Sequence, residues 1–268
     1  MYYISYSFWS YYISKIISYH PFLNSINLKS NNLSDEGVKG IFSSLNPESK
    51  LSTIDLSHNN INGNSIKYIN HYIIHNSFLR QLFLDYNKLD KNACKLIKEM
   101  LCNEQSNLRV ISLKRCKIFD NINLIFEGLE QNKKIEIINL SKNEIGNYRE
   151  QFEKITSCFK NNKSLKEIIL DSNFLDDINL KMIIEGLKEN NNLKSISLNE
   201  NQFSKKIVSE LYLIIEQNHF IKKCNLEKCG LSDDYLKQLN MALEIKPTYK
   251  YIEKEEEEKS IIEKNFNS

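Results

Sequence analysis

The stretch LRQLFLDYNKL, residues 79–89, decides the fold of this chain. Its leucines alternate with other residues as on a half-buried strand, and Leu82 and Leu84 would point to the same side, toward a core. The positions between the leucines should then face water, yet they include Phe83 and Tyr86. Either the core is misjudged, or the strand carries a surface built to hold something.

The same pattern, L-x-x-L-x-L-x-x-[N/C]-x-L, recurs along the chain and answers the first part of that question. Its copies begin at residues 23, 51, 79, 108, 135, 165, 193 and 221, so consecutive starts are 27 to 30 residues apart. Such regularity is typical of proteins in which each repeat packs only against its neighbours. We number these copies repeats 1 to 8 and the positions within each copy places one to eleven.

Between the copies, the apolar spacing changes to that of a helix. Apolar residues fall 15, 18 and 22 residues after the first leucine of a repeat, as in Val38, Ile41 and Leu45. Residues of the N-cap type precede several of these segments, namely Ser34, Asp90, Asp176, Ser204 and Ser232. Each repeat is therefore predicted to contain one strand and one helix.

The motif and its period of about 28 residues resemble the leucine-rich repeat family, in particular its ribonuclease-inhibitor-like subfamily. The resemblance implies an α/β solenoid, or horseshoe, with a parallel β-sheet on the concave face and helices on the convex face. In such folds the ninth-place side chains bond the neighbouring turn and form a column, here Asn31, Asn59, Asn87, Asn143, Asn173 and Asn201. Cys116 and Cys229 take this place in two repeats, and we interpret both as structural.

Three segments follow from this pattern: residues 1–22, the eight repeats at 23–245, and a tail at 246–268. The first segment matches the helical half of a repeat, and we interpret it as either a cap or part of a longer solenoid. Its polar interruptions predict neither a signal peptide nor a membrane anchor. The tail begins near Pro247 and contains a charge run, which we expect to be solvated, with docking to a basic partner as the alternative.

Composition and spacing argue against several functions. The 36 basic and 34 acidic residues leave a net charge of +2, so we expect no nucleic-acid or membrane partner. The 6 cysteines form no CxxC pair and favour reduced thiols in a cytoplasmic protein. His71 and His75 lack a third metal ligand, and His58, Asp55 and Ser57 are strand neighbours without oxyanion donors. We predict no enzyme, no metal and no cofactor.

The strand face opposite the leucines is the predicted binding surface, because places three, five, seven and eight point to it. Polar repeats at both ends flank a middle with apolar and aromatic side chains. Three of the chain's arginines also fall in repeats 3 and 4, and Tyr86 and Arg115 occupy neighbouring steps of one row, where they could stack. The predicted partner-binding set is Arg80, Phe83, Asp85, Tyr86, Arg109, Val110, Lys114, Arg115, Ile137 and Ile169.

These observations predict a monomeric, non-enzymatic scaffold that binds a protein partner through the concave sheet, centred on repeats 3 to 6. The partner's identity is not encoded in the repeats. One alternative is a GTPase-activating regulator resembling the Ran-activating members of the subfamily, although no defining motif of those proteins is matched outside the repeats. The other alternative is a fragment of a larger repeat-containing receptor.

Overall fold

A computed structural model describes residues 6–20 and 22–244 of the chain. The described residues fall into two compact units, which divide between Leu231 and Ser232. The described part of the second unit is helix α9 (Asp233–Glu244). The predicted charged tail, residues 246–268, lies outside the described residues.

Each of the eight repeats contributes one short strand to the first unit, as predicted. The strands are β1 (Ser25–Asn27), β2 (Thr53–Asp55), β3 (Gln81–Phe83), β4 (Val110–Ser112), β5 (Ile137–Asn139), β6 (Glu167–Ile169), β7 (Ser195–Ser197) and β8 (Lys223–Asn225). They form one parallel sheet in chain order, with places three to five of each repeat beside the same places of the next. Equivalent side chains therefore line up in rows across the sheet.

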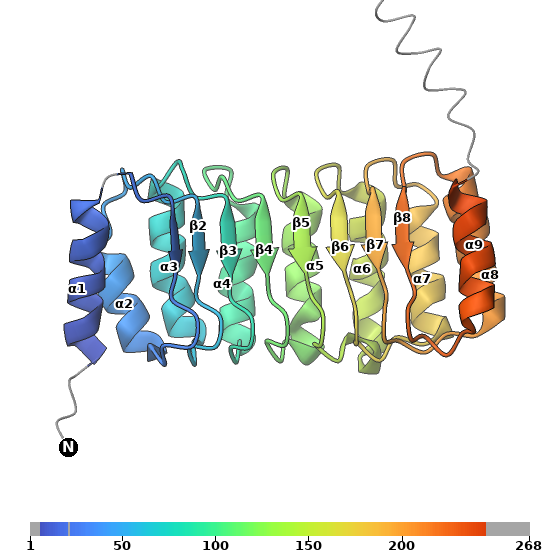
Figure 1. Cartoon of the computed structure of the whole chain (residues 1–268), viewed down its shortest axis with the longest axis horizontal. Coiled ribbons are helices and arrows are strands. Elements are labelled where there is room, and N and C mark those ends of the chain that lie inside the picture. Colours follow the sequence, from blue (N-terminus) through green and yellow to red (C-terminus); the bar gives the residue numbers. More distant parts are fainter. Residues whose placement is uncertain (1–5, 21, 245–268) are drawn as a thin grey trace, which may run out of the picture. The chain divides into compact units, whose positions relative to one another are not determined.

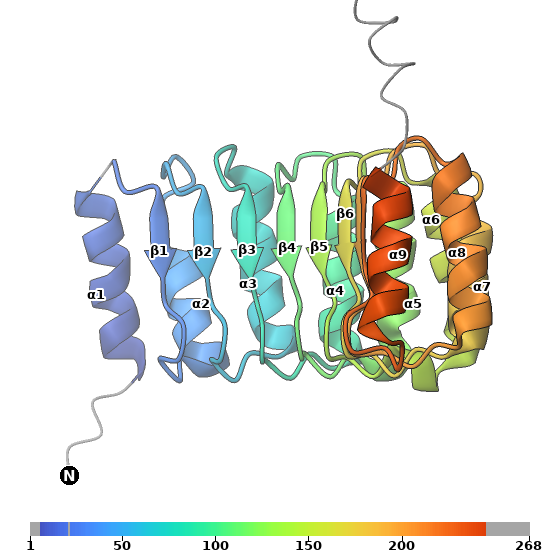
Figure 2. The same ribbon diagram turned by 45° about the vertical axis from the view of Figure 1, so that its right-hand side comes forward.

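Helices cover one face of this sheet (Figures 1 and 2). The α-helices of the first unit are α1 (Tyr6–Tyr19), α2 (Ser34–Ser44), α3 (Gly63–His75), α4 (Lys91–Cys102), α5 (Ile122–Gln131), α6 (Phe152–Asn161), α7 (Asp177–Leu187) and α8 (Lys205–Gln217). Three short 3-10 helices precede α5 and α6, namely η1 (Phe119–Asn121), η2 (Ile145–Asn147) and η3 (Arg149–Gln151). We call the sheet face turned away from α2 to α8 the open face.

The leucines and isoleucines of the motif form the core between the sheet and the helices, as predicted. Leu82 and Leu84 are fully buried, and so are Ile97 and Val38 on the facing helices. Fully burying a side chain of this kind stabilises the fold by roughly 1.5–3 kcal/mol. The α/β repeat fold predicted from the sequence is confirmed. No helix among the described residues is long and apolar enough to cross a membrane.

Helix N-caps follow the sequence prediction with one exception. Side-chain oxygens accept hydrogen bonds from backbone N–H groups of the first turn at Asp90, Asp176, Ser204 and Ser232. Ser34 was predicted as a cap and is not one, because α2 already begins at Ser34 and its N-cap is Leu33, without a side-chain bond. Asn62, which the sequence analysis missed, caps α3 by accepting from Asn64 N at 3.0 Å.

A column of ninth-place asparagines runs along the rim at which the strands end, which we call the C-terminal rim. Asn59 Oδ1 accepts from Asn31 N at 3.0 Å and from Leu33 N at 3.1 Å, both in the preceding repeat. Its Nδ2 donates to Leu28 O at 2.8 Å. Similar cross-repeat bonds are made by Asn87, Asn143, Asn173 and Asn201. The predicted asparagine column is confirmed.

The two cysteines of this column make one of the hydrogen bonds that an asparagine makes there, the bond to a backbone carbonyl of the preceding repeat. The Sγ atom of Cys116 donates to Leu84 O at 3.1 Å, and that of Cys229 donates to Leu198 O at the same distance. Burial raises the pKa of both thiols above the ordinary value, so they stay protonated and can donate. Their structural role is confirmed.

A second asparagine column lies along the N-terminal rim, at which the strands begin, and the sequence analysis missed it. Asn132 Oδ1 accepts from Lys134 N at 2.8 Å and from Ile135 N at 2.6 Å, while its Nδ2 donates to Leu101 O of the preceding repeat at 2.7 Å. Comparable bonds are made by Asn76, Asn162, Asn190 and Asn218. Each asparagine stands three residues before the first place of the following repeat, a recurrence that the sequence does show.

Candidate functional site

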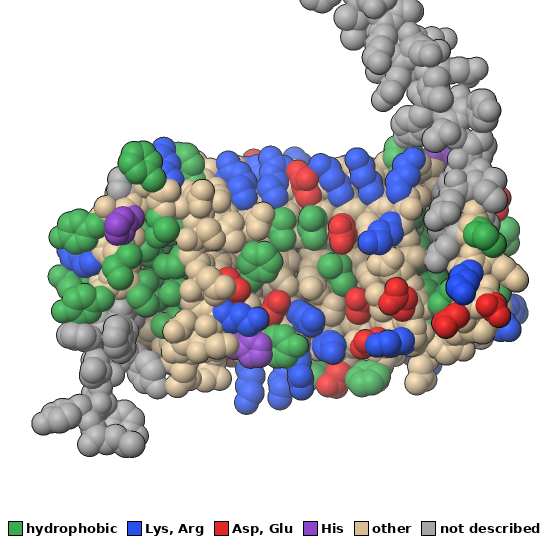
Figure 3. Space-filling view, in the orientation of Figure 1, with side chains coloured by type: hydrophobic (Ala, Val, Ile, Leu, Met, Phe, Trp, Pro, Cys, Tyr) green, Lys and Arg blue, Asp and Glu red, His purple; other side chains and the backbone are tan. Residues whose placement is uncertain are grey.

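Four apolar side chains form a zigzag across the open face. Val110 on β4 lies directly beside Ile137 on β5. Phe83 and Ile169 stand at place five on β3 and β6, diagonally next to Val110 and Ile137 respectively. Figure 3 shows hydrophobic side chains gathered in the middle of this face. We call these four residues the apolar zigzag. All four side chains are half-buried, and Phe83 is therefore less exposed to water than its place on the strand face predicts.

Three side chains of the eighth-place row stack on one another along the C-terminal rim. The rings of His58 and Tyr86 lie nearly parallel, with centroids 4.1 Å apart and an angle of 15° between their planes. Arg115 Cζ lies 5.5 Å from the centroid of the Tyr86 ring, at cation–π distance. The predicted stack of Tyr86 and Arg115 is confirmed, and His58 extends it. We call the three residues the rim stack. Tyr86 is half-buried, so it is less exposed to water than its place on the strand face predicts.

The backbone explains why the eighth-place side chains project at the rim. Tyr86 and His58 both have φ of 57°, and Arg115 has φ of 53°. This left-handed conformation is uncommon for residues other than glycine. Every eighth-place residue adopts it and none is glycine: Ser30, His58, Tyr86, Arg115, Lys142, Ser172, Glu200 and Lys228. The rim thus keeps side chains where the backbone would most readily accept glycine.

The cations of the C-terminal rim differ in how far they are neutralised. No carboxylate of the described residues lies within ion-pair distance of Arg115 or Lys142, and both side chains are exposed. Glu200, further along the row, accepts a hydrogen bond from Ser172 Oγ at 2.6 Å. That bond, with nearby lysines, holds the pKa of Glu200 below its ordinary value. The rim therefore presents unpaired positive charge next to the rim stack.

The N-terminal rim carries the other two predicted arginines, and their guanidinium groups are already engaged. Arg80 Nη1 donates to Ser77 O, three residues earlier in the chain, at 2.7 Å. Arg109 Nη1 lies 3.4 Å from Glu136 Oε1, and Lys166 Nζ lies 2.7 Å from Glu136 Oε2. The bond from Lys166 is the main cause that lowers the pKa of Glu136. Arg80 and Arg109 thus stand at the rim opposite the rim stack.

Asp85 and Lys114, also predicted to bind a partner, connect repeats 3 and 4. Asp85 Oδ1 accepts from Ser112 Oγ and, at 2.9 Å, from the backbone N of Lys114. Asp171 repeats this arrangement with Ser197 Oγ at 2.7 Å. The Asp85 carboxylate therefore fixes the geometry of the open face, and the half-buried Lys114 lies beside it.

The structure thus gathers the predicted residues into two groups. The apolar zigzag and the rim stack occupy repeats 2 to 6 of one face, while Arg80 and Arg109 lie along the opposite rim. His58 is the binding candidate that the sequence analysis left out. Its position immediately before Tyr86 and Arg115 in the eighth-place row was the available signal.

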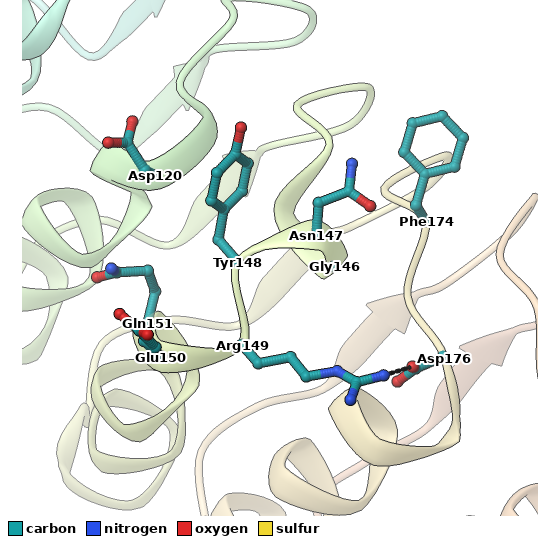
Figure 4. A pocket seen from close by; sticks show the side chains of 9 residues that line it. All are labelled: Asp120, Gly146, Asn147, Tyr148, Arg149, Glu150, Gln151, Phe174 and Asp176. Atoms are coloured by element: carbon teal, nitrogen blue, oxygen red, sulfur yellow. Dashed lines mark hydrogen bonds and ion pairs between the residues drawn. The ribbon is translucent and has the colours of Figure 1, made fainter.

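A cavity of about 760 Å³ opens where repeats 4 to 6 leave their strands (Figure 4). Arg149 reaches across it to Asp176, with Nη2 2.6 Å from Oδ2, and the Tyr148 ring forms part of its wall. Gly146 is required here, because a Cβ atom would lie 2.1 Å from Phe174 O. The lining is mainly polar, and its arginine is already paired.

The described residues include no group of three or more side chains that could hold a metal ion. All six cysteines are free thiols. His71 and His75 contact each other on α3, with ring centroids 4.8 Å apart.

Comparison with known proteins supports the fold. A leucine-rich repeat family model matches residues 19–42 and 49–69. No curated protein matches the chain.

Three solved structures share the architecture. The leucine-rich repeat protein LegL7 from Legionella pneumophila aligns over 91% of this chain and 77% of its own, with 15% identity and a TM-score of 0.57. The C-terminal domain of Caenorhabditis elegans tropomodulin has 16% identity and a TM-score of 0.50, over 62% of this chain and 98% of its own. Leiomodin-1 actin-binding site 2 has 18% identity and a TM-score of 0.50, over 60% of this chain and 95% of its own. With its eight motif copies, the matching family model and this shared fold, the chain is a leucine-rich repeat protein.

Proposed function

We propose that the chain is a non-enzymatic scaffold that binds a protein partner through the open face, centred on the apolar zigzag and the rim stack. The fold itself is one suited to protein interaction. The observation that carries the proposal is the joining, on one face, of four apolar side chains with a stacked His58, Tyr86 and Arg115. Tyrosine and arginine are enriched among the few residues that dominate the binding energy of protein interfaces.

The packing of these residues favours tight binding for a second reason. Phe83 and Tyr86 are half-buried, and Tyr86 is held between His58 and Arg115. Side chains already fixed in this way lose little conformational entropy when a partner binds. The lower exposure found in the structure therefore supports a binding role for both aromatics.

Other surfaces and activities have weaker support. In the cavity beside Arg149, the guanidinium is paired with Asp176. The leiomodin-1 structure is titled as an actin-binding site, but a likeness of 18% identity carries only the fold. Actin is accordingly one partner to test, by cosedimentation. The GTPase-activating alternative has no supporting contact among the described residues, and we expect no acceleration of GTP hydrolysis with purified small GTPases.

Site-specific photo-crosslinking tests the proposed surface. A benzoylphenylalanine at Phe83 would place the reactive group on the open face, and the matched control places it at Leu213, 56% exposed on α8. Irradiation in cells of the source organism should yield a discrete protein adduct from position 83 and none of that mass from position 213. Equal adducts from both positions, or none from position 83 in folded protein, would contradict a partner on the open face.

A further inference from the structure

We propose that the partner presents an amphipathic α-helix with acidic flanks, which lies across strands β3 to β6 on the apolar zigzag. This inference rests on the proposed function and adds the class of partner. It is carried by the dimensions of the open face and by the distribution of its charges. Figure 3 shows basic side chains along both rims, with hydrophobic and some acidic ones between them.

The width of the face matches one helix. Places two and eight mark its two rims. The strands cover places three to five and the eighth place is left-handed, so the six residues between the rims span at most roughly 20 Å. An α-helix with its side chains is about 10–12 Å across. One helix can therefore lie between the rims with its lower face on the apolar zigzag and its sides within reach of the rim cations.

The length of the apolar zigzag matches the spacing of anchors on such a helix. From β3 to β6 there are three strand spacings, or about 14 Å. A helix rises 1.5 Å per residue, so this length corresponds to about nine residues. Apolar anchors at positions i, i+3, i+4 and i+7 fall within that span, as in other helices that bind in grooves. The four residues of the zigzag thus provide contacts for about two helical turns.

The charges of the face favour an acidic occupant. Two acidic side chains of the face are already engaged by this chain: Asp85 binds the next repeat, and Glu136 lies between Arg109 and Lys166. A third, Glu167 on β6, lies beside Ile137 and forms no ion pair among the described residues. Arg115 and Lys142, by contrast, have no carboxylate at ion-pair distance among the described residues. A carboxylate supplied by the partner could pair with these two exposed cations, although Arg115 already lies over the Tyr86 ring and Lys142 is one of the lysines near Glu200.

A nucleic acid would fit the same surface less well. Stacked aromatics and cations do suit single strands, which also need a continuous basic track for their phosphates. Here Asp85, Glu136 and Asp171 interrupt the track in repeats 3, 5 and 6. The apolar zigzag, moreover, offers aliphatic contacts instead of stacking platforms over β4 to β6. These features favour the helix.

Synthetic peptides test the inference with the full chain. The probe is a fluorescent 14-residue helix with leucine at i, i+3, i+4 and i+7 and glutamate on its flanks. The controls are the same helix with lysine in place of glutamate and a scrambled peptide of the same composition as the acidic one. In anisotropy titrations we expect the acidic helix to bind at least tenfold tighter than either control, and more weakly as salt increases. Equal binding of the acidic and basic helices, or displacement of the acidic helix by a single-stranded oligonucleotide, would overturn the proposal.

Variants of the chain locate the peptide. The double variant Arg115→Glu and Lys142→Glu should weaken the acidic helix at least tenfold, and Ile137→Ala about fivefold. The matched control, Lys181→Glu, reverses an exposed charge on helix α7 and should change the affinity less than twofold. Circular dichroism confirms that each variant is folded. An unchanged affinity in the double variant would place the peptide elsewhere.

Two results separate this inference from the proposed function. If the acidic helix fails to bind while crosslinks still form at residue 83, the open face binds a partner of another class and only the inference fails. If residue 83 gives no crosslink and no peptide binds, both fail.

Discussion

The two rims of the sheet contain the same kinds of residues and use them differently. Each rim has an asparagine column, and each has an arginine from repeat 4. At the N-terminal rim, Arg109 pairs with Glu136, which also holds Lys166. At the C-terminal rim, Arg115 lies over Tyr86 and meets no carboxylate of the described residues at ion-pair distance. Residue type alone therefore does not identify a binding residue; what the fold leaves unpaired does.

The asparagine columns differ as well. Asn143, at the C-terminal rim, is fully buried and bonds the backbone of its own and the preceding repeat. Asn132, at the N-terminal rim, makes similar bonds but keeps 9% of its surface exposed. Water can more readily replace a lost partner where the surface is exposed. The C-terminal column should therefore contribute more to stability.

Removing one asparagine from each column tests that difference and has the largest expected effect. Asn143→Ala leaves buried backbone N–H and C=O groups without hydrogen-bond partners and should lower the free energy of unfolding by about 3 kcal/mol. Asn132→Ala should cost about 2 kcal/mol, because water reaches its site more easily. Urea denaturation of both variants measures the costs. A larger loss for Asn132→Ala would reverse the ranking of the two columns.

Restoring an asparagine at a cysteine step should have a smaller effect of the opposite sign. Asn59 N donates to the side-chain oxygen of Asn87, whereas Cys116 offers no such oxygen to Asn87 N. Cys116→Asn should therefore raise the free energy of unfolding by about 1 kcal/mol. Cys116→Ala serves as the control and should lower it, since the thiol bond to Leu84 O is lost. A loss of stability in Cys116→Asn would show that the buried site has no room for the amide.

Breaking the ion pairs of the N-terminal rim should have the smallest effect. Glu136 is partly exposed, so Glu136→Gln should cost less than about 1 kcal/mol at pH 7. The hydrogen bond from Lys166 lowers the pKa of Glu136 below its ordinary value. The stability contributed by the ion pairs is therefore fully present above the ordinary pKa of a glutamate and disappears as the pH falls through the lowered pKa. The free energies of unfolding of the wild type and Glu136→Gln, measured from pH 7 to pH 3, should become equal as the pH falls. A difference that persists at pH 3 would mean that the substitution acts through packing.

Much of the fold could be predicted from the sequence because the repeat sets both the strand register and the buried face. The column at Asn59 and the stack of Tyr86 on Arg115 follow from equivalent places lying side by side. The role of Ser34 could not be predicted, because a shift of one residue in the start of a helix changes which residue is its N-cap. The second column, with Asn132, lies outside the eleven-place motif.

The separate roles of the arginines could not be predicted. Arg80 and Arg109 have long, flexible side chains, and their partners are a backbone carbonyl and the carboxylate of Glu136. Motif places indicate which face or rim a side chain occupies, but not how its far end is engaged. The distinction between Arg109 and Arg115 therefore required the structure.

The affinity of the crosslinked partner for two arginine variants tests the central claim most directly. Arg115→Ala removes the unpaired cation of the rim stack, and Arg109→Ala removes a cation already paired within the chain. We predict that Arg115→Ala weakens binding about tenfold and that Arg109→Ala changes it less than twofold, measured by calorimetry on folded proteins. Equal losses in both variants, or a larger loss in Arg109→Ala, would contradict the assignment of binding to the C-terminal rim and the apolar zigzag.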